Sequence, residues 1–321
     1  MSIKVAIPQS NKLVHMFLFC RYAFAVLAMV ICLAGCSSAL HNTGSVPVLA
    51  KASPPAGWVA AKAYAEEKWW QPKADQNLRW YWQLQGNIDT SYDVDVYDID
   101  IDTPQPVINR LKARGIRLIC YFSVGTVEQF RSDANRFPHQ AIGETYPGYA
   151  DERWLDLKNY SLFASIMQAR LDRCAAKGFD GVEGDNVDAF LQQIPDDNGV
   201  VNTGTSFKIT RQHSIDYILW LASESHKRGL AFGLKNSEAV AIDVVDDVDW
   251  LITESCYVYR WCAEAQVFTR HNKPVFMTEY TEYLSDFTSA CAEARMFGYS
   301  AIYRDTGLTA RGIFEECLLS Y

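Results

Sequence analysis

The sequence predicts an α/β protein whose folded domain is a (β/α)8 TIM barrel. Three observations support this prediction: eight short β-rich runs, amphipathic helical stretches between most of them, and helices that close on a glycine just before the next strand. The chain has 321 residues, of which 49% are hydrophobic, so it can bury a large core. Barrels of this kind take about 250 residues as one domain. The predicted domain spans residues 67–321.

The eight predicted strands follow one another along the whole domain. They lie at 79–84, 94–99, 117–123, 179–184, 230–235, 249–254, 274–279 and 299–304. Helical patterns connect several of them, at 103–115, 161–178 and 210–229. The longest connections, 124–160 and 186–205, follow the carboxyl ends of strands, which is where a barrel builds its site.

Residues 1–36 form a different kind of sequence from the rest of the chain. They contain Lys4, Lys12 and Arg21 but no acid, followed by the apolar run YAFAVLAMVICLAGC. This pattern is typical of a secretory signal peptide rather than of a spanning helix. Its end, LAGC at 33–36, resembles a bacterial lipobox, which predicts lipidation of Cys36. The alternative is an ordinary thiol beside a plain cleavage site.

The segment 37–66 is rich in Ala, Ser and Pro and is expected to tether a lipid anchor to the domain. We therefore expect an exported protein that is either membrane-anchored or secreted. Ser37, directly after the cysteine, favours the outer membrane if the cell is Gram-negative. Translation from Met16 instead of Met1 would leave a signal of more typical length.

The net charge indicates which binding partners to expect, and the cysteines indicate which disulfides. The formal net charge is −8, and removal of the signal takes away basic residues only. Nucleic acid is therefore not an expected partner, whereas a cationic substrate is; we also expect a monomer. Export permits disulfides, and six cysteines follow the signal. The predicted pairs are Cys256 with Cys262 and Cys291 with Cys317, which leaves Cys120 and Cys174.

Side-chain alternation predicts which acids face the barrel interior. In the run FDGVEGDNVDAF (179–190), Val182 suits the helix side, so Glu183 and Asp185 face inward, with Asp185 at the mouth. On another strand, Glu254 follows the apolar run WLIT alone. These two acids, Asp185 and Glu254, are the candidate catalytic pair. The alternative for Asp185 is a cap on the following helix.

Polar and aromatic side chains collect near the other strand ends. The candidate substrate-binding residues are Trp82, Asp98, Tyr121, Glu183, Asn186, Lys235, Asn236, Tyr257 and Tyr280. Two carboxylates flanked by aromatic side chains suit glycosidic cleavage, because one protonates the departing oxygen and the other attacks C1 or activates water. Sugar rings stack on aromatic faces, although most of the aromatics are expected to pack in the core and loops.

Other chemistries have little support in the sequence. The chain lacks the G-x-S-x-G, H-E-x-x-H, phosphate-loop and G-x-G-x-x-G patterns. The six histidines have no ligand spacing, so neither a metal nor a cofactor is expected. The run DVDVYDIDID (93–102) lacks the glycine and terminal glutamate of a calcium loop. It is interpreted as a solvated strand edge with Asp98 turned toward the site.

The sequence resembles glycoside hydrolase family 114, the endo-α-1,4-polygalactosaminidase family. The similar elements run in order from Trp80 to the C-terminus and include WYWQLQG (80–86), VYDID (96–100), GFDGVEGDNVDAF (178–190) and ITESCYVYRWC (252–262). The resemblance implies a TIM barrel that hydrolyses α-1,4-linked, galactosamine-containing polysaccharide without a metal. The family's acid pair falls on Asp185 and Glu254.

Analogy with retaining α-galactosidases assigns Asp185 as nucleophile and Glu254 as general acid/base. The sequence departs from the family at Gly184, commonly proline, and at Ser255, commonly glutamine, which leaves the neighbouring subsite contacts open. Two alternatives remain. A chitinase-like barrel would need a glutamate where Val187 stands. A non-catalytic carbohydrate-binding lipoprotein on a degenerate barrel would keep the fold without the reaction.

Overall fold

The computed structural model describes residues 69–195 and 201–318. The predicted signal (1–36), Cys36 and the predicted tether (37–66) lie outside the described residues. The main sheet has the order β1-β2-β3-β7-β10-β11-β12-β13-β14. Its strands are β1 Trp80–Gln83, β2 Val96–Asp100, β3 Arg117–Ser123, β7 Gly181–Asp185, β10 Ala231–Lys235, β11 Trp250–Glu254, β12 Val275–Tyr280, β13 Ser300–Arg304 and β14 Phe314–Cys317.

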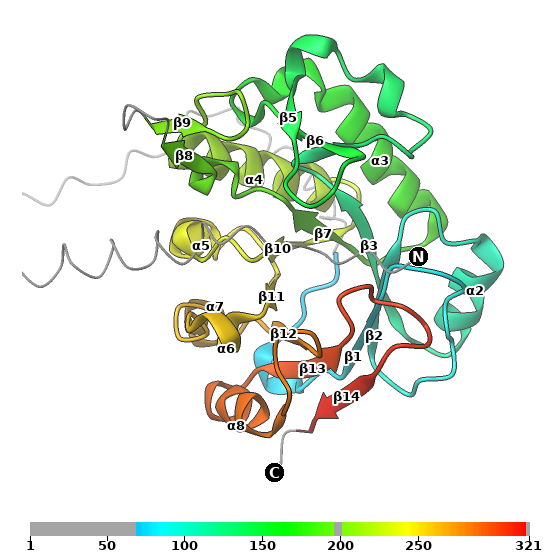
Figure 1. Ribbon diagram of the computed structural model, residues 1–321. Coiled ribbons are helices and arrows are strands. Elements are labelled where there is room, and N and C mark those ends of the chain that lie inside the picture. Colours follow the sequence, from blue (N-terminus) through cyan, green and yellow to red (C-terminus); the bar gives the residue numbers. More distant parts are fainter. Residues whose placement is uncertain (1–68, 196–200, 319–321) are drawn as a thin grey trace, which may run out of the picture. The chain divides into compact units, whose positions relative to one another are not determined.

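The first eight of these strands run parallel and coincide with the eight predicted ones, so the predicted α/β barrel fold is confirmed. The ninth strand, β14, was not predicted and pairs antiparallel with β13. The strands form a curled sheet with the helices on its outer side (Figure 1). The helices are α2 Gln105–Ala113, α3 Ala164–Lys177, α4 Arg211–His226, α5 Glu238–Val244, α6 Cys256–Tyr259, α7 Gln266–Arg270 and α8 Thr288–Phe297.

The three predicted helices correspond to α2, α3 and α4, and the other connections are shorter or irregular. Residues 84–95 join β1 to β2 as a loop. Single 3-10 turns lie at Ala74–Gln76, Ala134–Arg136, His139–Ala141, Leu157–Leu162 and Ala189–Leu191. In the described part of the chain, no helix has the length and apolarity to cross a membrane.

The two long insertions form small sheets above the carboxyl ends of the barrel strands. After β3, the strands β4 Thr126–Glu128, β5 Ile142–Thr145 and β6 Glu152–Leu155 pair in the order β4-β6-β5. After β7, β8 Gln193–Pro195 and β9 Val201–Thr203 form a hairpin. Both insertions are therefore placed to wall the mouth of the barrel.

The barrel closes between β1 and β13 without a regular ladder. The Trp80 indole donates to the carbonyl of Ser300 at 2.8 Å, and the Leu84 amide donates to the carbonyl of Leu308 at 3.1 Å. The buried Arg304 guanidinium also donates to the carbonyl of Trp82. Side chains and a loop thus complete the ring where backbone pairing stops.

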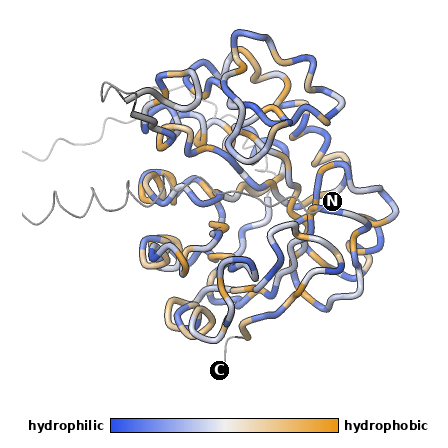
Figure 2. Tube along the Cα trace, viewed as in Figure 1, coloured by the Kyte–Doolittle hydropathy of each residue, from blue (hydrophilic) through white to orange (hydrophobic). Residues whose placement is uncertain are grey.

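The barrel interior is filled by an apolar cluster of its own. It contains Trp80, Trp82, Val96, Ile119, Ala231, Trp250, Ile252, Phe276, Tyr280, Ile302 and Leu308. Trp250 lies where two strands carry glycines: a Cβ at Gly233 would be 1.8 Å from its Nε1, and one at Gly181 would be 2.4 Å from its ring. These glycines are required by close approach. A second, larger cluster packs the sheet against the helices, and hydrophobic and hydrophilic residues alternate along the chain accordingly (Figure 2).

Three disulfides stabilise the outside of the barrel. The predicted pairs Cys256–Cys262 and Cys291–Cys317 are both present. The third joins Cys120 on β3 to Cys174 on α3.

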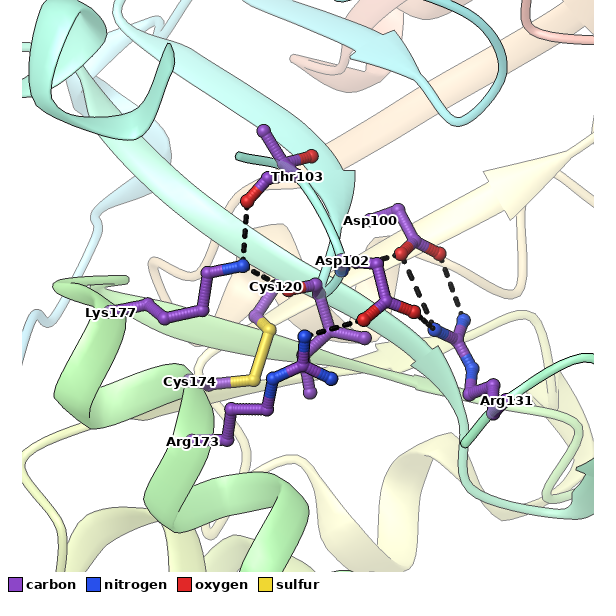
Figure 3. The surroundings of a disulfide bond; sticks show 9 residues. Asp100, Asp102, Thr103, Cys120, Arg131, Arg173, Cys174 and Lys177 are labelled. Atoms are coloured by element: carbon purple, nitrogen blue, oxygen red, sulfur yellow. Dashed lines mark hydrogen bonds and ion pairs between the residues drawn. A yellow bond between two sulfur atoms is a disulfide. The ribbon is translucent and has the colours of Figure 1, made fainter. Parts of the chain in front are cut away.

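The acidic run 93–102 is neutralised by arginines rather than by solvent alone. The buried Arg131 pairs with Asp100 at 2.8 Å and with Asp102 at 3.1 Å, beside the Cys120–Cys174 disulfide (Figure 3). Arg173 on α3 also pairs with Asp102. The interpretation of this run as a solvated edge is therefore wrong at its carboxyl end, because its acids hold the first insertion and α3 against the sheet.

Candidate active site

A cavity of about 430 Å³ lies at the carboxyl ends of the barrel strands. Eight of the eleven residues proposed from the sequence line it, including Asp185 and Glu254; Asp98, Glu183 and Tyr257 do not. The lining residues are Trp82, Leu84, Gln85, Asp100, Tyr121, Glu128, Phe130, Tyr146, Tyr149, Asp151, Glu152, Asp185, Asn186, Asp188, Lys235, Asn236, Glu254, Tyr280, Thr306, Gly307 and Leu308.

Three neighbouring strands end in the same way at this cavity. β7, β10 and β11 each finish on an inward-facing charged residue, Asp185, Lys235 or Glu254. The next residue has a positive φ in every case: 63° at Asn186, 49° at Asn236 and 53° at Ser255. Such backbone is uncommon outside glycine and costs free energy, and it is concentrated at functional sites. It turns the chain sharply after each charged side chain.

The Lys235 ammonium lies between the two candidate catalytic carboxylates. Its Nζ is 2.8 Å from Glu254 Oε2 and 3.4 Å from Asp185 Oδ1. It also lies 4.7 Å from the centre of the Trp82 ring, as a cation–π contact. The sequence marked Lys235 as a polar residue at a strand end, and the structure adds that this one cation contacts both acids.

Hydrogen bonds fix the orientation of both carboxylates. Asp185 accepts from the Tyr121 hydroxyl at 3.2 Å and from the Asn186 amide at 2.9 Å. The expected alternative, Asp185 as a helix cap, does not apply, because the next α-helix begins only at Arg211.

Glu254 accepts from the Tyr280 hydroxyl and from Asn236 Nδ2, the latter at 3.2 Å. The Asn236 side chain also accepts from the Glu254 amide at 2.8 Å. Both oxygens of the Glu254 carboxylate therefore face donors.

The charges in this group depend on one another. Burial opposes ionisation of Glu254, but the Lys235 ammonium and the hydrogen bonds from Tyr280 and Asn236 outweigh it and lower the pKa of Glu254. Burial likewise opposes the charged form of Lys235, but the carboxylates around it raise its pKa well above the ordinary value. The site thus contains an ionised Glu254 and a charged lysine.

Further acids reach the cavity from loops that sequence reasoning did not select. Glu128 and Glu152 come from the sheet of the first insertion, and Asp188 follows β7. Burial raises the pKa of Glu152 to about 7 and that of Asp188 to about 6. Lys235 is the single cationic side chain among the described residues that line this cavity, against seven acids. The aromatic side chains Phe130, Tyr146 and Tyr149 come from the same insertion.

The three proposed residues outside the cavity have other surroundings. Asp98 and Glu183 face the barrel interior below it and are wholly buried. The Tyr257 amide donates to Glu279 at 2.8 Å, and the Tyr257 ring contacts Arg260.

One group of potential metal ligands occurs in the described residues, Cys256, Cys262 and Glu279. Its two sulfur atoms are bonded to each other, and Glu279 already accepts the Tyr257 amide. It therefore offers no thiolate to a metal.

A parallel barrel with carboxylates from two strands, set in an acidic, aromatic-lined cavity, defines a carbohydrate-cleaving barrel enzyme, a glycoside hydrolase. The sequence profile of glycoside-hydrolase family GH114 matches residues 59–319. The chain belongs to this family, and the resemblance noted in the sequence is confirmed.

Known structures agree with this assignment. The crystal structure of Aspergillus fumigatus Ega3 in complex with galactosamine superposes with a TM-score of 0.67 and 30% sequence identity, covering 77% of this chain and 97% of that one. The glycoside hydrolase domain of PelA from Pseudomonas aeruginosa has a TM-score of 0.58 at 13% identity, covering 73% of this chain and 97% of that domain, and shares the fold. An uncharacterized protein of Deinococcus radiodurans is 28% identical over 231 residues, which are 64% of this chain and 69% of the relative.

Proposed function

We propose that this glycoside hydrolase cleaves an α-1,4-linked, galactosamine-containing polysaccharide internally, with Asp185 and Glu254 as its catalytic carboxylates. The observation that carries the proposal is the placement of these two acids on either side of Lys235 in the cavity. Family membership and the Ega3 structure, described as a complex with galactosamine, support the substrate class.

The charge of the cavity supports a cationic substrate. Protonated amines on the polymer would meet acids such as Glu152 and Asp188, whose pKa values are raised by burial and would be lowered by a nearby cation. Exposed aromatic side chains at the mouth, Phe130 and Tyr149, suit stacking on sugar rings beyond the cleaved bond.

In the proposed reaction Asp185 attacks the anomeric carbon while Glu254 gives its proton to the departing oxygen. Water, activated by Glu254, then hydrolyses the glycosyl–Asp185 bond and restores both groups. In the unliganded site Lys235 lowers the pKa of Glu254. This order of roles therefore requires bound substrate to weaken the contact between Lys235 and Glu254, so that Glu254 can take up a proton.

The spacing of the acids supports retention of configuration. The nearest oxygens of Asp185 and Glu254 both contact one nitrogen, at 3.4 Å and 2.8 Å. These two oxygens cannot lie farther apart than the sum of these distances, so the two acids are close together, as in retaining pairs. Retaining pairs lie about 5–5.5 Å apart.

The test is incubation of the purified domain with a partly deacetylated α-1,4-galactosamine polymer, with measurement of reducing ends and fragment size. Wild type is expected to release mid-sized fragments early. Asp185→Asn and Glu254→Gln should each reduce the rate at least 100-fold, the lower range for a positioned acid or base. Asp216→Asn, an exposed acid on α4, is the matched control and should leave the rate unchanged. Wild type without release, or variants as active as wild type, would overturn the proposal.

Azide distinguishes the two roles. With Asp185→Ala, azide should replace the nucleophile and give the β-glycosyl azide. With Glu254→Ala, azide should react with the covalent intermediate and give the α-glycosyl azide. The reverse pattern would exchange the assignments of Asp185 and Glu254 and leave the pair intact.

The two alternatives make different predictions. A carbohydrate-binding protein would retain the polymer in a pull-down without shortening it. A chitinase-like enzyme would shorten chitin; against it, Val187, at the position of the chitinase glutamate, is wholly buried in the outer core.

A further inference from the structure

Two carboxyl groups lie below the cavity that the proposed reaction does not use. Asp98 on β2 and Glu183 on β7 are both fully buried in the barrel interior. Among the described groups, no N–H or O–H donor hydrogen-bonds to either carboxyl. The nearest cation, Lys235 Nζ, lies 3.4 Å from Glu183 Oε1. Burying an ionised carboxylate without a hydrogen-bond donor costs a large free energy. Asp98 and Glu183 therefore cannot both be ionised while neither has a partner.

The two carboxyl groups can satisfy each other. They are close enough to form a hydrogen bond once one of them carries a proton. Two ionised carboxylates at this distance would repel, whereas a carboxyl donating to a carboxylate makes a strong charge-assisted hydrogen bond. Burial, followed by the negative charge of Glu183, raises the pKa of Asp98 well above its ordinary value. Burial also raises the pKa of Glu183, to about 7, against the opposing effect of Lys235.

Charged and titratable groups from several barrel strands surround this pair. Lys235 on β10 is the cation, and Asp185 and Glu254 add negative charge from above. Two hydroxyls also face Glu183, those of Tyr121 on β3 and Tyr280 on β12, both with a raised pKa. The described surroundings thus contain four carboxyl groups around one ammonium.

We propose that Asp98 and Glu183 share one proton and together present a single negative charge to the Lys235 ammonium. This charge lies below the lysine, opposite the two catalytic carboxylates. It holds the ammonium between the pair and the catalytic carboxylates, 3.4 Å from Glu183 and 2.8 Å from Glu254. Asp98 and Glu183 are therefore positioning residues, which act on the reaction through Lys235. Where it concerns activity, this inference rests on the proposed hydrolase function.

Isosteric amides test the proton count. Asp98→Asn and Glu183→Gln each replace a carboxyl by a neutral donor, so each single variant keeps one negative charge in the pair. Each single variant is expected to keep the alkaline limb of the pH profile of kcat/KM in place, because the charge that faces Lys235 is unchanged. The double variant removes that charge, and its kcat/KM is expected to fall at least tenfold. The alkaline limb of its pH profile should also lie at lower pH, because Lys235 then interacts only with the catalytic acids.

The other protonation states give different results. If both acids were ionised, each single amide would change the charge and alter activity by itself. If both were protonated, the double amide would be as active as the singles. Either result overturns the inference. Glu279→Gln is the matched control, because Glu279 is also buried, with a pKa raised to about 7, but contacts the Tyr257 amide instead of Lys235. It should leave the alkaline limb unchanged.

Melting temperatures separate this inference from the proposed function, because they need no substrate. When the pKa of a carboxyl group is raised in the folded protein, the free energy of unfolding falls as the pH rises from the ordinary pKa toward the raised one. Wild type should therefore lose stability relative to Asp98→Asn between pH 5 and pH 8, by about 3 °C or more. Parallel curves for the two proteins would refute the shared proton even if no polysaccharide were cleaved.

Discussion

Removing the disulfide between Cys120 and Cys174 tests how the barrel is stabilised around its first insertion. The bond closes a loop of 54 residues between β3 and α3. In the chain-entropy treatment a loop of this length stabilises the fold by about 4.2 kcal/mol. In a domain of this size, a loss of about 1 kcal/mol in the free energy of unfolding lowers the melting temperature by about 2–4 °C. The double variant Cys120→Ala with Cys174→Ala should therefore melt about 8–17 °C lower.

The other two disulfides provide an internal scale. Their separations of 26 and 6 residues give about 3.5 and 2.2 kcal/mol in the same treatment. Differential scanning calorimetry of the three double-alanine variants should therefore rank the losses as Cys120–Cys174, then Cys291–Cys317, then Cys256–Cys262. A loss below about 2 °C for the first pair, or a reversed ranking, would refute the entropic reasoning and assign the stability to the ion pairs of Asp100 and Asp102 instead.

Two further predictions concern charge and location. Lys235→Met should raise the pKa of Glu254, so the alkaline limb of the pH profile of kcat/KM should move up by about 1–3 pH units. The control is Lys227→Met, which replaces an exposed lysine. An unmoved limb in Lys235→Met would contradict the role of Lys235. We also propose that Cys36 carries a lipid and anchors the exported protein. Cys36→Ala should then release it from the membrane fraction, and unchanged partitioning would refute lipidation.

The sequence located the strands and their inward faces because both depend on local alternation. Glu183, Asp185 and Glu254 face inward as expected, and Lys235, selected only as a strand end, lies among them. Alternation gives the face of a residue but not its depth, so it could not show that Asp98 lies below the cavity while Tyr121 lines it.

The cavity walls were not predictable by the same reasoning. Glu128, Glu152 and Tyr149 belong to an insertion whose strands have at most four residues, too short to leave a periodic pattern. Only the length of this insertion indicated that it contributes to the site. Likewise, the acids at 100 and 102 could not be matched with Arg131, because these contacts join segments about thirty residues apart along the chain.

Trp250 has a consequence beyond filling the barrel interior. It lies at the start of the strand that ends in Glu254, and it rests on Gly181 and Gly233, in the strands that end in Asp185 and Lys235. This indole therefore fills the barrel interior beneath the charged ends of all three strands. A smaller side chain at position 250 would leave a cavity against both glycines, because backbone hydrogen bonds fix the spacing of these strands. The packing beneath the charged strand ends thus depends on an apolar residue that does not line the cavity.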